Sequence, residues 1–480
     1  MRRLKQAATG LLFVAAFTMN SAAAQESGNL MVGWASVSIT PDKPVALAGQ
    51  MYTRVSKSVR DPVTATVLAL ETKGSAADQA IMISCDLVGI VPEIEEELRH
   101  RVRERLPDFD SNKLFLNATH THTAPETRDG RYQIPPGVMQ PAEYRAFAVD
   151  RIASAVLEAW NGRKPGGVSW ALGHAVVGHN RRAIYKDGSA RMYGKTDSPD
   201  FRALEGYEDH GLEMLFLWDA QDKLTGVAIN IACPSQVLES QLNVSADFWY
   251  DVRKLIKEQF SENLFVFPMT GAAGDQSPHF LFRRRAEERL RERLGVSQTE
   301  EIARRIVNAV SYVLPAARKD IRPSVPFVHK VEGLNLPVRK ITAEEAAAAK
   351  QEYERLSKLP ETERSRYVLL NRSRNVMDRY EQQSKQPYYK MKLHAIRLGD
   401  IAIATNPFEL FLDYGIQIKA RSQAEQTFVV QLAGGGTYLP TAKAVAGGHY
   451  GAEAASNLVG PEGGQVLVDR TVDAINSMWK

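Results

Sequence analysis

The sequence contains two cysteines, little net charge and no apolar run long enough to cross a membrane. Cys85 and Cys233 are too few for a disulfide scaffold. They form one disulfide, stay as buried thiols, or one of them serves as a metal ligand. The formal net charge is +4 on 480 residues, and three positive charges belong to Arg2, Arg3 and Lys5. The rest of the chain is therefore nearly neutral, which excludes the basic surface of a nucleic-acid-binding protein.

The first 24 residues have the pattern of a cleavable secretory signal. Basic residues precede an apolar segment, 11–19, and three alanines end at Ala24, before Gln25. The apolar segment is shorter than the roughly 20 residues that a membrane helix needs. No cysteine follows the cleavage site to carry a lipid. We therefore expect a signal peptide over residues 1–24 and a secreted or periplasmic protein without a transmembrane helix.

What the sequence does contain is ordinary globular composition, 44% hydrophobic and 24% charged. Apolar and β-branched runs predict strands, whereas apolar residues three or four apart predict helices. The predicted strands are 63–72, 79–87, 113–118, 168–177, 212–218, 225–232, 263–268 and a pair within 391–406 that turns at Gly399-Asp400. The predicted helices are 92–106, 141–160 and 247–260. This mixture predicts an α/β fold, with mixed β-sheets in layers flanked by helices.

Residues 342–386 differ from the rest in being strongly helical and polar. Thr342 and Glu345 form a capping box before an Ala-rich helix, and Pro360 separates it from a second charged helix. We expect an exposed helical hairpin inserted in the domain. The charged helix 283–294 is typical of a solvated face. With no internal repeat and no linker, residues 25–480 are predicted to form a single domain.

The sharpest local motif is NATHTHTAPE, residues 117–126. His120 and His122 follow a predicted strand, and the period of two places both rings on one side if the strand geometry persists. One imidazole could then bind a metal while the other handles a proton. The alternative is a pair of loop histidines without a function.

Three further motifs each allow a structural and a functional interpretation. GAAGDQSP, 271–278, is either a plain turn or a loop that presents Asp275 and Ser277 at the sheet edge. In NPFELFLDYG, 406–415, Glu409 is a helix-start residue or a ligand, because a buried carboxylate needs a cation. Tyr438 and Tyr450 lie on the Gly-rich segments 434–441 and 449–456, where a tyrosine usually only packs.

These motifs, together with GHNRR at 178–182, occur in an order that resembles the neutral ceramidase family. The resemblance runs from about residue 30 to the C-terminus and covers the family's N-terminal catalytic domain. We expect the family's further C-terminal, immunoglobulin-like domain to be absent. The resemblance implies a zinc amidase that splits ceramide into sphingosine and a fatty acid, with one Zn²⁺ per chain.

In that family two histidines, a glutamate and a tyrosine hold the zinc. By resemblance the first histidine is His120, the glutamate is Glu409 and the tyrosine is Tyr438. The segment of the second histidine resembles NIACPS, 230–235, which places Cys233 at the ligand position. A thiolate is a good zinc ligand, so Cys233 is expected to complete the set. The alternatives are an empty site or a substitute among the other histidines, His174, His179 and His210.

The resemblance also implies the catalytic residues. His122 matches the family histidine close to the attacking water, and Arg181 and Tyr450 are expected to stabilise the oxyanion. Ser277 of the GDQSP motif is expected to orient substrate or water, with Asp275 beside it. Two departures from the family are Gln276 in that motif and the NPFE context of Glu409, where the family usually has P-G-E.

The sequence thus predicts an exported zinc hydrolase of acyl amides with a small-molecule or lipid substrate, no nucleic-acid partner and transient contact with a membrane surface. Two alternatives remain open at this stage. One is the same scaffold acting on an ester or a glycan-derived substrate. The other is a non-catalytic binding protein with a degraded metal site and a Cys85–Cys233 disulfide.

Overall fold

The computed structural model describes residues 28–74 and 77–480. The predicted signal peptide, residues 1–24, lies outside the described residues. Within the described part of the chain, no helix combines the length and apolar character needed to span a bilayer.

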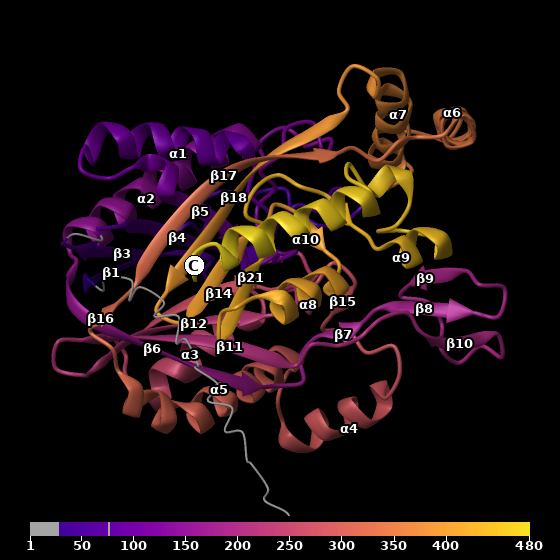
Figure 1. Cartoon of the computed structure of the whole chain (residues 1–480). Coiled ribbons are helices and arrows are strands. Elements are labelled where there is room, and N and C mark those ends of the chain that lie inside the picture. The colour runs from indigo at the N-terminus through magenta and orange to yellow at the C-terminus, as the bar shows by residue number, and fades with distance from the viewer. Residues whose placement is uncertain (1–27, 75–76) are drawn as a thin grey trace, which may run out of the picture.

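A nine-stranded mixed sheet forms the centre of the molecule (Figure 1). Its strands follow the order β14-β12-β11-β6-β1-β3-β4-β5, with β16 beside β1. Most neighbours are antiparallel, whereas β12–β14 and β4–β5 are parallel pairs. The strands are β1 Gly28–Ser38, β3 Thr64–Lys73, β4 Gln79–Cys85, β5 Leu114–Ala118, β6 Lys164–His174, β11 Gly211–Asp219, β12 Leu224–Ile231, β14 Phe265–Thr270 and β16 Ser324–Val325.

A second sheet of four strands packs on the first through an apolar layer. Its order is β17-β18-β19-β21. The predicted strand pair is confirmed, because β18 and β19 turn at Gly399, whose φ of 64° suits a glycine. Phe267 of the first sheet shares a buried cluster with Ile396 and Phe428 of the second. The four strands are β17 Phe327–Pro337, β18 Tyr388–Leu398, β19 Ile401–Thr405 and β21 Gln426–Val430.

Helices cover the outer faces of both sheets, which gives four layers (Figure 1). Helices α1 and α2 pack on β1, β3, β4 and β5, and α3 and α5 pack on the other half of the same sheet. Helices α8 and α10 pack on the second sheet. The bounds are α1 Pro92–Arg105, α2 Pro141–Asn161, α3 Phe248–Gln259, α5 Gln298–Ala317, α8 Leu412–Arg421 and α10 Pro461–Asn476. This architecture confirms the predicted layered α/β fold.

The inserted hairpin is also present, as α6 Ala343–Ser357 and α7 Arg366–Gln382. Both bonds of the capping box between Thr342 and Glu345 form. The two helices pack against each other and project from one corner of the molecule (Figure 1). The charged helix α4, Arg284–Leu294, buries none of its residues, as expected of a solvated face.

Short strands and one short helix shape the loops between the layers. The two-residue pairs are β2 Ser58–Val59 with β13 Asn243–Val244, β7 His179–Asn180 with β15 Gln276–Ser277, and β20 Glu409–Leu410 with β22 Tyr438–Leu439. A three-stranded sheet combines β8 Arg182–Tyr185, β9 Ala190–Met192 and β10 Phe201–Leu204, and helix α9 is Ala442–Gly447. The motifs at 178–182, 271–278, 406–415, 434–441 and 449–456 lie on or beside these loops, whereas NATHTHTAPE begins in β5.

Candidate active site

His120 lies just beyond the end of β5, where the chain leaves the sheet. Its backbone has φ 62°, a left-handed conformation that is uncommon in a non-glycine residue. Its Nδ1 lies 2.6 Å from the carbonyl oxygen of Val88. Because a carbonyl only accepts, the proton is on Nδ1 and the Nε2 lone pair points away from Val88.

The Nε2 of His120 faces Glu409, at 3.4 Å from Oε2. Glu409 is register partner of Tyr438 in the parallel pair β20–β22, and the Tyr438 phenol bonds to the Glu409 carboxylate. Burial favours the neutral acid, but His120, Tyr438 and Arg181 outweigh it and lower the pKa of Glu409. Three of the four predicted metal ligands thus converge.

Cys233 does not join this group. After β12 ends at Ile231, the Cys233 amide bonds back to the Ile231 carbonyl at 2.9 Å, so the chain curls. The thiol is fully buried in the apolar cluster of β11, β12, α3 and α5, where Sγ donates to the Pro234 carbonyl at 3.5 Å. Burial raises the pKa of this thiol well above its ordinary value, so it is neutral. Cys85 and Cys233 are both free, in separate apolar clusters, which removes the disulfide alternative.

The histidines considered as substitutes for the fourth ligand also lie elsewhere. His179 and His210 both face Glu208, each at 3.4 Å. His174 is exposed at the end of β6. None of them reaches the group formed by His120, Glu409 and Tyr438.

His122 sits beside His120, with the ring centroids 4.9 Å apart. Gln236 Nε2 lies 2.9 Å from His122 Nε2, and Gln236 Oε1 accepts from Arg181 at 3.1 Å. The arginine therefore fixes the amide orientation, and His122 Nε2 is the acceptor. A side chain at Gly49, which has φ 93°, would meet the His122 ring at 2.4 Å, so glycine is required there. Burial lowers the pKa of His122 to about 4.

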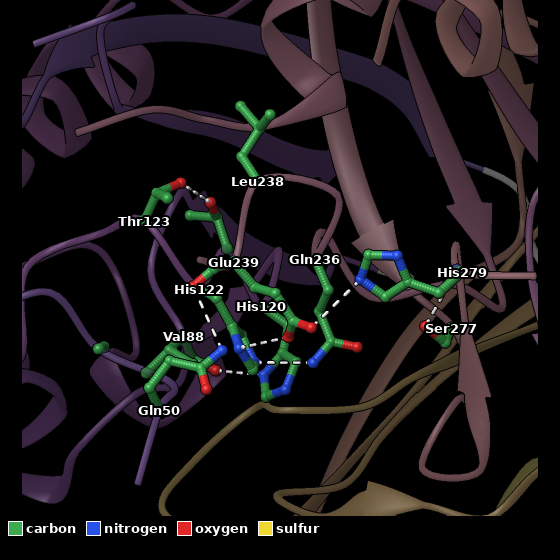
Figure 2. Close-up of polar contacts among 12 residues, drawn as sticks. Gln50, Val88, His120, His122, Thr123, Gln236, Leu238, Glu239, Ser277 and His279 are labelled. Carbon is green, nitrogen blue, oxygen red and sulfur yellow. Dashed lines mark hydrogen bonds and ion pairs between the residues drawn. The ribbon is translucent and has the colours of Figure 1, made fainter. Parts of the chain in front are cut away.

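Glu239 links His122 to a third histidine. Its Oε2 is 3.4 Å from His122 Nδ1 and its Oε1 is 3.2 Å from His279 Nε2. Figure 2 shows Glu239 between the two rings. Burial opposes its charge, but bonds from the two histidines lower the pKa of Glu239. The carboxylate thus orients the His122 ring through the protonated Nδ1.

Arg181 lies behind Tyr438, fully buried and without a carboxylate hydrogen-bonded to it among the described residues. It donates to the Tyr193 hydroxyl at 2.9 Å, the Gly274 carbonyl at 2.9 Å and the Tyr438 hydroxyl at 3.3 Å, besides Gln236. Burial opposes the charge, but the neighbouring phenols and Glu409 keep the pKa of Arg181 well above its ordinary value. Tyr450 stacks edge-on against Tyr438, with ring centroids 5.5 Å apart.

Asp275 and Ser277 support the site from behind. Asp275 accepts from the Leu412 amide and from Asn180, both at 2.9 Å, and its carbonyl accepts from the Arg181 amide. Burial raises the pKa of Asp275 to about 6. Ser277 Oγ is 3.1 Å from the Tyr193 hydroxyl, which in turn contacts Arg181. Ser277 therefore reaches the metal-ligand candidates through Tyr193 and Arg181, and Asp275 reaches them through Arg181 and through the Leu412 amide of the segment that carries Glu409.

A cavity of about 250 Å³ opens onto His120, His122, Glu409, Tyr438 and Tyr450. The glycine-rich loop 434–436 also lines the cavity. The remaining lining residues include Gly49, the apolar side chains of Val88, Ile90, Val91 and Leu432, and the two arginines Arg128 and Arg131. A larger hollow of about 590 Å³, around β8 and β9, shares none of the metal-ligand candidates. The smaller cavity is therefore the candidate active site.

The donors in this cavity fit a metal ion only in part. A histidine lone pair and a carboxylate that face each other at 3.4 Å call for a proton or a cation between them. His120, Glu409 and Tyr438 would supply three donors, the number that catalytic zinc sites use. Within residues 28–74 and 77–480, however, no three of His, Cys, Asp and Glu are grouped so that they could hold a metal. A three-donor metal site made by His120 and Glu409 therefore requires the phenol oxygen of Tyr438 as its third ligand.

Five contributors to the site were not predicted from the sequence: Gly49, Tyr193, Gln236, Glu239 and His279. Gln236 and Glu239 closely follow the NIACPS segment, and His279 follows GDQSP. Their nearness to predicted motifs is the only signal that could have identified them. Tyr193, which connects Ser277 to Arg181, carries no such signal.

The layers and the site loops together define a fold of the neutral ceramidase type, and comparison with solved structures confirms it. Neutral ceramidase from Pseudomonas aeruginosa matches with a TM-score of 0.66 and 16% identity, over 94% of this chain and 75% of that one. A ceramidase complexed with C2 matches with a TM-score of 0.65 and 15% identity, over the same shares. No protein-family model and no curated protein sequence matches the chain.

Proposed function

We propose that the chain is a zinc-dependent hydrolase of acyl amide bonds. The observation that carries this proposal is the convergence of His120, Glu409 and Tyr438 on one cavity, beside His122. A fold shared with ceramidases supports it. His120, Glu409 and Tyr438 would hold one zinc ion per chain, which would polarise a carbonyl and lower the pKa of a water molecule.

The protein's own residues provide the remaining chemistry. In hydrolysis, water oxygen adds to the acyl carbon, the C–N bond breaks, and the water's proton moves to the amine nitrogen. His122 Nε2 is the acceptor that would take a proton from the attacking water and later return it to nitrogen, once the Gln236 amide that donates to it moves aside. Tyr450 lines the cavity and is suited to donate to the oxyanion. Arg181 holds the Tyr438 hydroxyl and adds positive charge behind it.

Ser277 and Asp275 act as positioning residues in this proposal. Ser277 holds Tyr193 against Arg181, and Asp275 holds the Arg181 backbone. Cys233 has no role at the reacting atoms. We further propose that residues 25–480 form one catalytic domain, exported by the signal over 1–24, which acts on a small-molecule or lipid amide with transient contact to a membrane surface.

Hydrolysis of a small substrate panel, with and without a chelator, tests the proposal. The panel contains a short-chain ceramide, an N-acyl amino acid, an aryl ester and an aryl glycoside. We expect chelator-sensitive release of amine from at least one amide and about one zinc per chain by elemental analysis. Cleavage of the ester or glycoside alone would transfer the proposal to that bond. A protein that binds no metal and cleaves none of the four would contradict the proposal and favour the alternative of a binding protein.

A further inference from the structure

Arg131 lines the site cavity and stacks over the Tyr132 ring, but among the described residues no carboxylate lies within ion-pair distance of it. Arg128, beside it, donates to both oxygens of the buried Glu126 at 2.8 and 3.0 Å. Glu409 is faced by His120, Tyr438 and Arg181. Arg131 is half-buried, donates to the Met51 thioether sulfur at 3.7 Å, and buries its Nε without a hydrogen-bond partner.

A half-buried guanidinium with an unpartnered Nε gains from a group outside the chain that accepts from its N–H donors. Its planar donors match a carboxylate best, since two parallel N–H groups can bond the two oxygens. Glu126 is electrostatically coupled to Arg131, but its oxygens already accept from the Arg128 side chain and from the Thr127 and Arg128 amides, so Glu126 makes no direct bond to Arg131. The cavity thus presents a donor for an anion beside the metal-ligand candidates.

The loop that carries Arg131 is held in position by the inserted hairpin. The Tyr367 hydroxyl of α7 donates to the Gly130 carbonyl at 3.2 Å. Val368 of the same helix shares a buried cluster with Tyr132, whose own hydroxyl bonds the Gln50 carbonyl at 2.7 Å. Residues on both sides of Arg131 are therefore fixed, and the guanidinium is kept at the cavity wall.

The size of the cavity limits what accompanies the anion. About 250 Å³ is below the range of roughly 300–1,000 Å³ typical of sites for drug-sized ligands. Because His120 and Arg131 line the same cavity, a substrate with its scissile amide at His120 and an anionic group at Arg131 carries both groups within that cavity. A neutral amide with two long chains satisfies neither condition.

We propose that Arg131 recognises a carboxylate close to the scissile amide, so that the preferred substrates are N-acyl amino acids. This inference rests on the proposed function and names its substrate class. Arg131 acts as a specificity-determining residue that contacts the substrate carboxylate and takes no part in bond cleavage.

The test compares N-octanoylglycine with N-octanoylpropylamine, which has the same acyl group and no charge. We expect the wild-type protein to favour the glycine conjugate in kcat/KM. Arg131→Gln should raise KM for that conjugate about 10- to 100-fold, as expected for a lost charged hydrogen bond, with kcat little changed. It should leave the neutral amide unaffected, and Arg131→Lys should fall between. Arg289→Gln, on the solvated helix α4, is the matched control with no expected effect.

Calorimetric binding of N-octanoylglycine separates this inference from the proposed function. Binding by the wild type that weakens in Arg131→Gln, without turnover, supports the carboxylate site and defeats the hydrolase. Turnover of the neutral amide with equal or better kcat/KM, or an equal effect of Arg131→Gln on both amides, overturns the carboxylate site. Absence of both binding and turnover for the glycine conjugate overturns it as well.

Discussion

At the scale of single residues, side-chain direction decides which predicted groups reach the cavity. His120, Glu409 and Tyr438 were expected together only through the family resemblance of their motifs, and in the structure each follows or forms a short strand that brings it to the same place. Cys233 could not be placed in this way. The backbone turns tightly between Ile231 and Cys233 and directs the thiol into the core. No residue type in this segment predicts the turn.

Zinc content should therefore depend on His120 and not on Cys233. We expect His120→Ala to lose both metal and hydrolysis, because it removes the Nε2 donor that faces Glu409. Cys233→Ala should retain metal and lose stability, of the order of 1 kcal/mol, as other small core deletions do. Elemental analysis and urea unfolding of both variants measure the two effects. Loss of zinc in Cys233→Ala would show that the thiol is a ligand.

Glu239→Gln should lower kcat about 10- to 100-fold, because a group that orients a catalytic side chain has effects of this size. The substitution keeps the shape of the side chain but removes the charge that faces His122 Nδ1 and His279. Steady-state kinetics with the amide substrate measures the effect. The chain offers a matched control in Glu208, which also lies between two histidines but away from the cavity. An equal loss in Glu208→Gln would mean that the effect of Glu239→Gln is not local.

At the scale of elements, the strongly periodic segments were predictable, and those whose partners are distant were not. Helix α1 begins at Pro92 and buries Ile94, Leu98 and Val102, as its spacing predicts. Helices α5, α8 and α10 were not predicted, and the first turn of α10 contains Gly463 and Gly464. These glycines allow close packing, since a Cβ at Gly464 would meet the Tyr414 ring at 2.5 Å. Glycine is a poor helix former, so two glycines in a helix are explained only by this packing in the folded protein.

The hairpin helix α7 should influence substrate affinity through the Arg131 loop. We expect Val368→Ala, which removes buried volume beneath Tyr132, to raise KM for N-octanoylglycine several-fold. Val376→Ala is the matched control, since Val376 is equally buried on α7 but packs against Ile341 and Ala454. Both variants should lose about 1–3 kcal/mol of stability, and only the first should change KM. Equal KM values in the two variants would contradict the coupling.

At the scale of the whole molecule, the two sheets meet at a buried histidine pair. His329 of β17 and His394 of β18 are joined Nε2 to Nδ1 at 3.0 Å, and His329 also bonds the Gln79 carbonyl of β4. Burial lowers the pKa of His329 to about 4 and that of His394 well below its ordinary value. No motif marked these two histidines, because their pairing depends on how the sheets stack.

This pair should make stability fall as the solution becomes acidic. Between the ordinary histidine pKa of about 6.5 and the lowered values, the unfolded chain binds more protons than the folded one, so stability rises with pH. We expect the free energy of unfolding to decrease from pH 7 to pH 5 less steeply in His394→Asn than in the wild type. Urea unfolding at several pH values measures both slopes. Burial raises the pKa values of Asp247 and Asp275 to about 6, and these two groups make stability decrease as the pH rises. The slopes are therefore compared between the variant and the wild type, in which both aspartates are present. Parallel slopes would contradict the assignment.

The pairing of Glu409 with Tyr438 has a consequence for how this scaffold can diversify. The two residues are separated by a long stretch of chain, yet a single rung of the β20–β22 ladder sets their spacing. Loops on either side of the β20–β22 pair can be changed without altering the distance between the Glu409 carboxylate and the Tyr438 phenol. A library that varies the cavity-wall residues Ile90, Val91 and Leu432 while keeping 409–410 and 438–439 should therefore yield new selectivities on an unchanged reaction centre.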